Sequence, residues 1–189
     1  DLEALVKRKP DLVFSGVKYF FFNKRKIWLN DYLEIFAIPY IASSKAALDN
    51  ESDKNKAKKI MQKKNIRTAD FFITNPGEHL KESSIPIKFP LFIKPITGGD
   101  SRGIDKNSIV FNFEDFTAKV LDIKLNQNSP SLVETYLDGK EYSVGIFEDS
   151  FDGSLQAMPI EIIVKKNIDG HCILDFDVKK NDEEEVILV

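Results

Sequence analysis

The sequence has one cysteine, Cys172, among its 189 residues, so the chain cannot form an internal disulfide. This scarcity is typical of proteins that fold in a reducing compartment. No apolar run approaches the length of about 18 residues that a membrane-spanning helix needs, so we expect no membrane partner. Positive charge is not in excess, because the formal net charge is −3. This balance gives no general reason to expect a nucleic-acid partner, and any basic site must be local.

The two ends of the chain lack the signals of natural termini. The first ten residues, DLEALVKRKP, look like part of an amphipathic helix and have no apolar segment of the kind that a signal peptide carries. We therefore expect a cytoplasmic location. The chain closes on the apolar run EVILV with no capping signal. We expect from both ends that the sequence is a piece of a longer protein.

The composition is that of a globular protein, with 42% hydrophobic and 30% charged residues. Residues 11–17 have the pattern of a buried strand, residues 26–36 have apolar side chains at helical spacing, and residues 39–43 suggest a short strand. This order predicts a β-α-β piece, so residues 1–48 are expected to be the C-terminal part of an N-terminal α/β domain.

A lysine-rich helix is predicted over residues 48–66, with Asn50 as its N-cap. Most of its lysines are expected to form a solvated face, Lys54 in the first turn being the exception. Strands at 69–75, 90–94 and 108–111 and a helix at 112–127 should follow. We expect residues 49–130 to form a central subdomain.

Three Asp-Gly pairs, at 138–139, 152–153 and 169–170, lie between apolar or alternating runs. Such pairs are strong hairpin signals, so residues 131–178 are predicted to form an antiparallel meander. Residues 131–189 would then be the start of a C-terminal subdomain. The predicted fold class is α+β combined with α/β, with room for a cleft between the two parts.

The stretch KPITGGDSRGI, residues 94–104, is the first candidate for chemistry. Lys94 ends a buried strand, and Gly98 and Gly99 allow a loop whose free N–H groups can cradle an anion. Ser101 adds a hydroxyl group. The loop is neither a Walker A motif, in which the lysine follows the glycines, nor a dinucleotide fingerprint, which needs a glycine where Asp100 stands. The residues alone fit a phosphate-binding loop and an ordinary glycine-rich hairpin equally well.

Two carboxylates follow in LVETYLDGKEYSVGIF, Glu134 on a strand and Glu141 just past a turn. The segment between them could offer backbone groups to a flat ring, with the carboxylates accepting from an exocyclic amine or a ribose hydroxyl. Acids on strands are also often no more than solvent-facing residues. This alternative stays open on the residues alone.

Taken in order, the segments resemble the ATP-grasp superfamily, and within it the D-alanine–D-alanine ligases and their close relatives. DLVFSG and LEIFAIPYIASSKAALDNESDK are similar to the end of that family's N-terminal domain and the entry to its central domain. NKAKKIMQKKNIRTADFFI resembles the lysine-containing helix and next strand, and FPLFIKPITGGDSRGI the strand with its glycine-rich loop. LVETYLDGKEYSVGIF resembles the nucleotide hairpin, and MPIEI and ILDFDVKK resemble the strand and mobile loop that follow.

The resemblance implies an ATP-grasp fold and an ATP-dependent ligase of cell-wall peptidoglycan synthesis that joins two small-molecule amino acids through an acylphosphate. ATP and Mg²⁺ are the implied cofactors, with the metal ligands expected beyond the end of this chain. The fragment alone is therefore expected to be inactive. Since such ligases are often dimers, a homodimer is an open expectation.

The resemblance also implies a role for individual residues. Lys179 and Ser101 would be the catalytic residues, with Lys179 approaching the γ-phosphate. Glu134 would accept the adenine amine and Glu141 would hold the ribose. The full set of implied ATP-binding residues is Lys54, Lys94, Gly99, Ser101, Glu134, Tyr136, Leu137 and Glu141.

Two departures from the family pattern concern substrate choice. The family's loop usually reads Glu-Gly-Ser-Ser where this chain has Gly98, Gly99, Asp100 and Ser101, and Lys180 stands where a tyrosine commonly follows the lysine. Both positions bear on the second amino acid or on closure of the site. A degenerate nucleotide-binding module without ligase activity is the alternative that these departures motivate, and a loop that is only a turn is a third.

Overall fold

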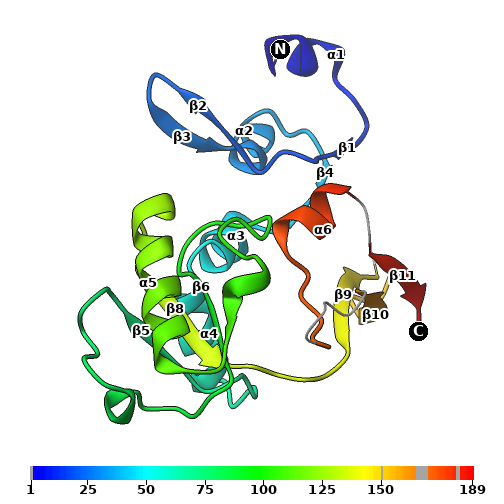
Figure 1. Ribbon diagram of the computed structural model, residues 1–189. Helices are drawn as coiled ribbons and strands as arrows, with labels where there is room; N and C mark the ends of the chain where they lie inside the picture. The colour runs from blue at the N-terminus through cyan, green and yellow to red at the C-terminus, as the bar shows by residue number, and fades with distance from the viewer. Residues whose placement is uncertain (1, 150, 165–169, 182–183) are drawn as a thin grey trace. The chain divides into compact units, whose positions relative to one another are not determined.

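The computed structural model describes residues 2–149, 151–164, 170–181 and 184–189 (Figure 1). The chain divides into two compact units, Asp1–Ala57 and Lys58–Val189. Each unit has its own hydrophobic core. Within the described stretches no helix is long and apolar enough to cross a lipid bilayer.

The first unit contains the β-α-β piece that the sequence predicts. Its elements are α1 (Leu2–Arg8), β1 (Val13–Phe14), β2 (Tyr19–Phe22), β3 (Arg25–Trp28), α2 (Leu29–Ile35), β4 (Tyr40–Ile41) and α3 (Lys45–Glu51). Strands β1 and β4 pair in parallel, and α2 lies between them in the chain. The strand expected to be buried over residues 11–17 is shorter and more exposed, since β1 has two residues and Phe14 is 82% exposed. Leu33 of α2 is fully buried and forms the centre of a small core with Leu29 and Ile38.

The helix predicted over residues 26–36 begins later than its apolar spacing suggests. Residues 25–28 belong to β3, which pairs with β2 in an antiparallel hairpin, and α2 starts only at Leu29. The aromatic run of β2 favours a strand. Trp28 packs edge-on against Tyr19 across the hairpin, with ring centroids 5.7 Å apart. Cross-strand aromatic packing therefore outweighs the helical spacing at these positions.

The single helix predicted over residues 48–66 is wrong, because the chain forms two helices there. Helix α3 ends at Glu51 and α4 (Lys54–Lys63) begins three residues later. The carboxylate of Asp53 accepts a hydrogen bond from the backbone N–H of Lys56 at 3.0 Å. A side chain that satisfies a free N–H in this way starts a new helix, so Asp53 takes the capping role predicted for Asn50.

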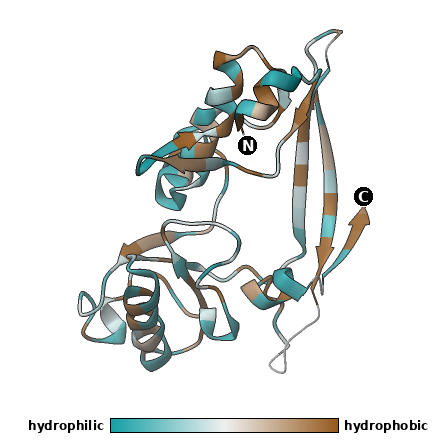
Figure 2. Cartoon of the chain, turned by 90° about the horizontal axis from the view of Figure 1, so that it is seen from above, coloured by the Kyte–Doolittle hydropathy of each residue, from teal (hydrophilic) through white to brown (hydrophobic). Residues whose placement is uncertain are grey.

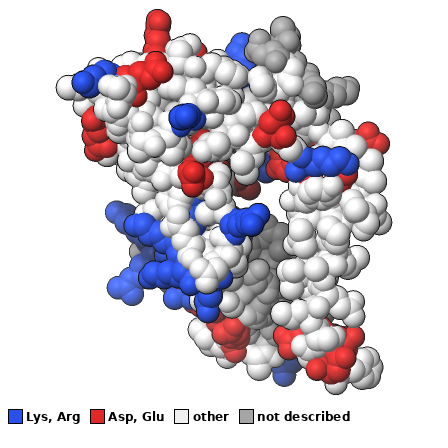
Figure 3. All heavy atoms as spheres, turned by 90° about the horizontal axis from the view of Figure 1, so that it is seen from below, with Lys and Arg blue, Asp and Glu red and all other residues white. Residues whose placement is uncertain are grey.

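The exposed lysines near α4 confirm most of the predicted solvated face. Those exposed to solvent are Lys56, Lys59, Lys63 and Lys64. Figure 3 shows basic side chains gathered on one part of the face that it draws. Lys58 is different, since it is buried.

The second unit has a four-stranded antiparallel sheet in the order β5-β8-β6-β7. Its elements are β5 (Phe71–Thr74), η1 (Glu82–Ser84), β6 (Leu91–Pro95), η2 (Lys106–Ser108), β7 (Ile109–Val110), α5 (Phe113–Gln127) and β8 (Ser131–Thr135). The strands and the long helix agree with the sequence prediction. Asn112 caps α5 by accepting from the N–H of Asp115 at 2.9 Å.

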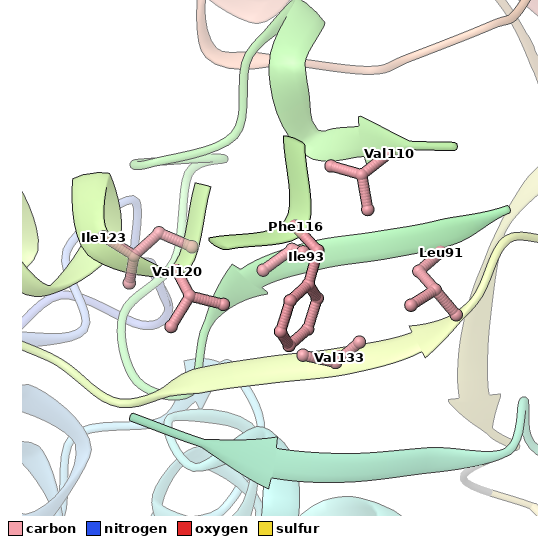
Figure 4. Close-up of a cluster of buried hydrophobic side chains, with 7 residues drawn as sticks. All are labelled: Leu91, Ile93, Val110, Phe116, Val120, Ile123 and Val133. Atoms are coloured by element: carbon pink, nitrogen blue, oxygen red, sulfur yellow. The ribbon is translucent and has the colours of Figure 1, made fainter. Parts of the chain in front are cut away.

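Helix α5 covers one face of this sheet. Its side chains Phe116, Val120 and Ile123 point at residues of β6 and β8, including Ile93 and Val133 (Figure 4). All five of these side chains are buried. Burying a large apolar side chain stabilises a fold by about 1.5–3 kcal/mol, so this cluster is the main core of the unit.

The pleat of the strands places polar residues on the other face. Successive side chains along a strand point to opposite faces of the sheet. The Lys94 side chain therefore points away from the face that carries Ile93, and the Glu134 side chain points away from the face that carries Val133. In the register of β6 and β8, Lys94 pairs with Leu132 while Phe92 pairs with Glu134. Lys94 and Glu134 are therefore diagonal neighbours on the face that α5 leaves free.

A second sheet of three antiparallel strands, β9 (Glu141–Glu148), β10 (Leu155–Ile163) and β11 (Glu185–Leu188), completes the described part of the unit. Figure 2 shows apolar and polar bands along its long strands. The second Asp-Gly pair makes the β9–β10 hairpin turn, as predicted, with Gly153 at φ +70°. The pair Asp138-Gly139 makes no hairpin, because β8 and β9 belong to different sheets.

The end of the predicted meander differs as well. Asp169 of the third Asp-Gly pair lies outside the described residues. Residues 172–178, predicted as a strand, lead instead into the short helix α6 (Phe176–Asn181). The carboxylate of Asp175 accepts from the N–H of Val178 at 2.9 Å, which favours a helical start over an extended chain.

Candidate nucleotide site

A pocket of about 610 Å³ lies on the free face of the four-stranded sheet. Its walls come from β6, β8, the β8–β9 segment, the ends of β9 and β10, and residues 172–179. Seven of the predicted site residues line it: Lys94, Ser101, Glu134, Tyr136, Leu137, Glu141 and Lys179. Segments far apart in sequence thus bring nearly all the predicted chemistry into one hollow.

Glu134 occupies the floor of the pocket between two ammonium groups. Its Oε1 accepts from Lys94, and its Oε2 lies 2.9 Å from the Nζ of Lys58. Both the glutamate and Lys58 are buried. A buried carboxylate needs such partners, and each oxygen here has its own. A carboxylate has about four lone-pair positions, so Glu134 retains acceptor capacity for a ligand amine.

The segment between the two sheets offers backbone groups to the same pocket. The N–H of Tyr136 is bound to the carbonyl of Pro90 at 3.1 Å, which fixes the start of the segment. Within the described part of the chain nothing pairs with the backbone N–H and C=O of the next residue, Leu137. The Tyr136 hydroxyl donates to the carbonyl of Cys172 at 3.4 Å. Burial, more than the nearby Asp138 and Cys172, raises the pKa of Tyr136.

Glu141 and Lys179 supply a second pair of opposite charges to the pocket. Partial burial raises the pKa of the Glu141 carboxyl above its ordinary value. The ammonium groups of Lys179 and then Lys94 act in the opposite direction, and more weakly. Lys179 and Lys94 are thus pocket cations whose fields reach the Glu141 carboxylate.

The glycine-rich loop is held in an unusual backbone conformation. Gly98 has φ +93°, and the two non-glycine residues Asp100 and Ser101 have φ +57° and +55°. This left-handed geometry is rare for side-chain-bearing residues and turns the loop sharply. The Ser101 hydroxyl donates to the carbonyl of Leu174 at 2.9 Å. The loop is thereby tied to the segment that leads to Lys179.

Two predicted residues do not line the pocket. Gly99 lies in the loop, where its carbonyl accepts from the N–H of Arg102 at 3.2 Å. Lys54 is the first residue of α4 and belongs to the first unit. Their roles in phosphate binding stay predictions.

Sequence reasoning missed Lys58, Glu161 and Cys172. Glu161 lines the pocket and forms an ion pair with Lys140 at 2.9 Å. Cys172 also lines the pocket. Lys58 was counted among the solvated lysines of its run. The signal available for it was its spacing of four residues from Lys54, which puts both on one helix face.

A pocket of about 640 Å³ beside α5 has a different character. Its buried Lys119 is paired with Asp105 at 2.9 Å and Asp122 at 3.2 Å. These contacts tie α5 to the loop before β7. None of the predicted site residues is among those that line this pocket.

The described residues do not form a metal site. Nowhere in the described stretches do three or more histidine, cysteine, aspartate or glutamate side chains come together in a way that could hold a metal ion. Mg²⁺ prefers several oxygen ligands in octahedral geometry. Since Mg²⁺ is usually held by one or two carboxylates together with substrate phosphates and waters, magnesium as a cofactor stays a prediction.

Solved structures share this architecture. The D-alanine–D-alanine ligase from Bacillus anthracis complexed with ATP aligns with a TM-score of 0.62 at 23% identity, covering 100% of this chain and 56% of that one. The VanG D-Ala:D-Ser ligase from Enterococcus faecalis aligns with a TM-score of 0.65 at 19% identity, covering 94% and 49%. The fold is thus that of the ATP-grasp D-alanine ligases.

The sequence comparisons go further than the fold. The family model described as D-ala D-ala ligase C-terminus matches residues 60–189, and the chain belongs to this family. The D-alanine–D-alanine ligase of Aquifex aeolicus is 31% identical over 167 residues, which cover 87% of this chain and 52% of the relative. That of Leptospira interrogans is 30% identical over 159 residues, covering 80% and 43%. The chain spans about half the length of the curated relatives it matches.

Proposed function

We propose that this chain is the ATP-binding part of an ATP-dependent ligase that joins two amino acids, with D-alanine as the favoured substrate. The observation that carries the proposal is the convergence of Lys94, Glu134, Glu141 and Lys179 in one pocket. Family membership supports the same conclusion. The reaction uses small soluble substrates, and we propose a cytoplasmic location for it.

The proposed pose of ATP follows from the chemistry of the walls. Glu134 accepts a hydrogen bond from the adenine amine, and the unpaired backbone of Leu137 binds the ring edge beside Tyr136. Glu141 accepts from the ribose hydroxyls. Lys94 contacts the phosphates, since an ammonium–phosphate contact is a strong, charge-assisted one.

The proposed chemistry has two steps. A carboxylate oxygen of the first amino acid attacks the γ-phosphorus of ATP, the bond to the bridging oxygen breaks, and ADP leaves with the electron pair. The amine of the second amino acid then attacks the acyl carbon, phosphate leaves, and the amine loses a proton. Phosphoryl transfer depends mainly on positioning and on neutralising charge.

The catalytic residues proposed for the first step are Lys179 and Ser101. The Lys179 ammonium, on α6, would compensate charge that develops on the γ-phosphate. The loop residues Gly99 and Ser101 would close over the phosphates, with Lys54 as a further phosphate ligand. Since Ser101 is tied to Leu174 at 2.9 Å, closure of the loop and the approach of α6 would occur together.

The test is ADP release by the full-length protein with ATP and magnesium salt, across a panel of D- and L-amino acids. Release with D-alanine is the expected result. Release with another amino acid alone would keep the ligase reaction and assign the altered Gly98, Asp100 and Lys180 positions to a changed substrate. Tight ATP binding without release for any amino acid would contradict the ligase activity.

A further inference from the structure

The ammonium group of Lys58 is fully occupied by protein acceptors. It donates to the Thr68 hydroxyl at 2.6 Å and to the carbonyl of Ala69 at 3.2 Å, and it lies 2.9 Å from Oε2 of Glu134. A lysine has three N–H donors, so these contacts use all of them. The group also lies 4.9 Å from the centroid of the Phe71 ring. Lys58 therefore has no donor left for a nucleotide.

The two lysines beside Glu134 differ in their access to the pocket. Lys94 lines it, whereas Lys58 does not. The Lys94 side chain is 20% exposed and the Lys58 side chain 10%. Glu134 thus stands between one ammonium that faces the ligand space and one that lies behind it.

We infer that Lys58 is a positioning residue for nucleotide recognition, an inference that rests on the proposed function. Lys58 holds the Glu134 carboxylate ionised and in one orientation, and it compensates the glutamate's charge from behind. Two ammonium groups and one carboxylate leave a net charge of about +1 at this point. Lys94 can therefore turn toward a phosphate without leaving Glu134 as an unpaired buried anion.

Loss of Lys58 has two consequences in this scheme. The Glu134 Oε2 loses its anchor, so the carboxylate no longer presents a fixed acceptor to the adenine amine. The Glu134–Lys94 pair becomes a neutral one-to-one pair, which holds Lys94 back from the phosphates. The first effect changes the preference for adenine, and the second weakens every nucleoside triphosphate alike.

The ratio of the dissociation constants for inosine triphosphate and ATP separates a positioning role of Lys58 from a general effect on stability. Inosine carries an oxygen in place of the adenine amine, so it cannot donate to Glu134. We would measure the dissociation constants of both by calorimetry with the full-length protein. Lys58→Met is expected to lower the ATP preference by at least about tenfold, the scale of a lost hydrogen bond to a charged group. Lys58→Arg should keep most of the preference, since the guanidinium retains charge and donors. Lys59→Met removes an exposed lysine next in sequence and should match the wild type.

The outcomes separate the inference from the function beneath it. A wild-type protein that binds no ATP, or prefers it no more than inosine triphosphate, contradicts the proposed function. A preference that Glu134→Gln abolishes and Lys58→Met leaves intact overturns the role of Lys58 alone. Equal weakening of both nucleotides by Lys58→Met overturns the positioning of Glu134 by Lys58, because loss of the adenine acceptor must weaken ATP more than inosine triphosphate.

A second variant keeps the test decisive if Lys58→Met does not fold. Thr68→Val removes one acceptor of the Lys58 ammonium and leaves every charge in place. The expected result is a smaller fall in the ATP preference. An unchanged preference in a folded Thr68→Val protein overturns the inference.

Discussion

The two sheets of the second unit contribute to the pocket in opposite ways. In the four-stranded sheet, four strand residues are fully shielded from solvent, namely Leu91, Ile93, Leu132 and Val133, and a charged residue beside them, Glu134, is buried as well. In the three-stranded sheet no residue of β9, β10 or β11, all of them described, is buried. The first sheet fixes its polar groups by packing, whereas the second presents them from an exposed backbone ladder. Truncation of apolar side chains should therefore cost more stability in the first sheet than in the second.

The largest expected difference is in stability. Leu91→Ala leaves a cavity under α5 and should lower the free energy of unfolding by about 2–5 kcal/mol. Ile146→Ala in β9, where the side chain is 59% exposed, should change it by less than about 0.5 kcal/mol. Urea unfolding followed by circular dichroism measures both. Similar losses would contradict the contrast between the sheets.

A pair of glycines sharpens the same contrast. A Cβ at Gly103, which has φ +76°, would meet a side-chain atom of Pro95 at 2.6 Å. Gly103→Ala should cost about 1–3 kcal/mol of stability through strain and overlap together. Gly153→Ala in the β9–β10 turn has φ +70° and no contact closer than 3.9 Å, so only the backbone term of about 1 kcal/mol applies. A Gly153 effect as large as that of Gly103 would show that packing is not the cause.

Lys94 tests the binding role of the first sheet. Lys94→Ala removes a charge-assisted contact to phosphate and should weaken ATP binding by about 1–3 kcal/mol. The exposed Lys88, just before β6, provides a control of equal charge, and Lys88→Ala should leave the affinity unchanged. Calorimetric titration with ATP measures both. Unchanged affinity in Lys94→Ala would refute the phosphate assignment.

Glu141 tests the second sheet. Glu141→Ala should weaken ATP binding by about 1 kcal/mol through the loss of a hydrogen bond to ribose. Binding of 2′,3′-dideoxy-ATP, which lacks both hydroxyls, should change much less. Equal losses for the two nucleotides would rule out the ribose contact and leave only a general electrostatic role.

The smallest effect concerns pH. Burial raises the pKa of Glu141 in the folded protein, so the folded state holds this proton more tightly than the unfolded state does. The stability linked to the proton is present below the ordinary glutamate pKa and is lost as the pH rises through the folded value. In the Glu141→Gln protein this loss of stability does not occur, because glutamine has no carboxyl group to titrate. Its melting temperature relative to wild type should therefore increase from pH 4 to pH 7, and a constant difference would contradict the raised pKa.

Local patterns were enough to predict most of the second unit. The apolar run PLFIK and the helical spacing after Asn112 are each satisfied by burial in the same core. The β9–β10 hairpin likewise follows from one Asp-Gly turn. The residues alone left the roles of Lys94, Glu134 and Glu141 open, and the resemblance to a known family marked them as site residues.

The misses have two kinds of cause, a choice between two local caps and contacts between residues far apart in sequence. Asp53 divides a lysine-rich stretch into two helices, although either Asn50 or Asp53 has a capping side chain. Asp138-Gly139 has hairpin chemistry but joins strands of different sheets, which is a property of sheet order and not of the dipeptide. Lys58 is buried because Glu134, 76 positions further along the chain, needs a second cation. A periodicity within one helix carries no information about such a partner.

The wall of the pocket also contains the chain's single thiol. Cys172 is exposed and lines the hollow beside Tyr136. A maleimide fluorophore therefore has one point of attachment in these 189 residues, and that point adjoins the space proposed for adenine. Occupancy of the pocket can thus be followed optically in the unmodified sequence, with protection from labelling as the reporter of a bound nucleotide.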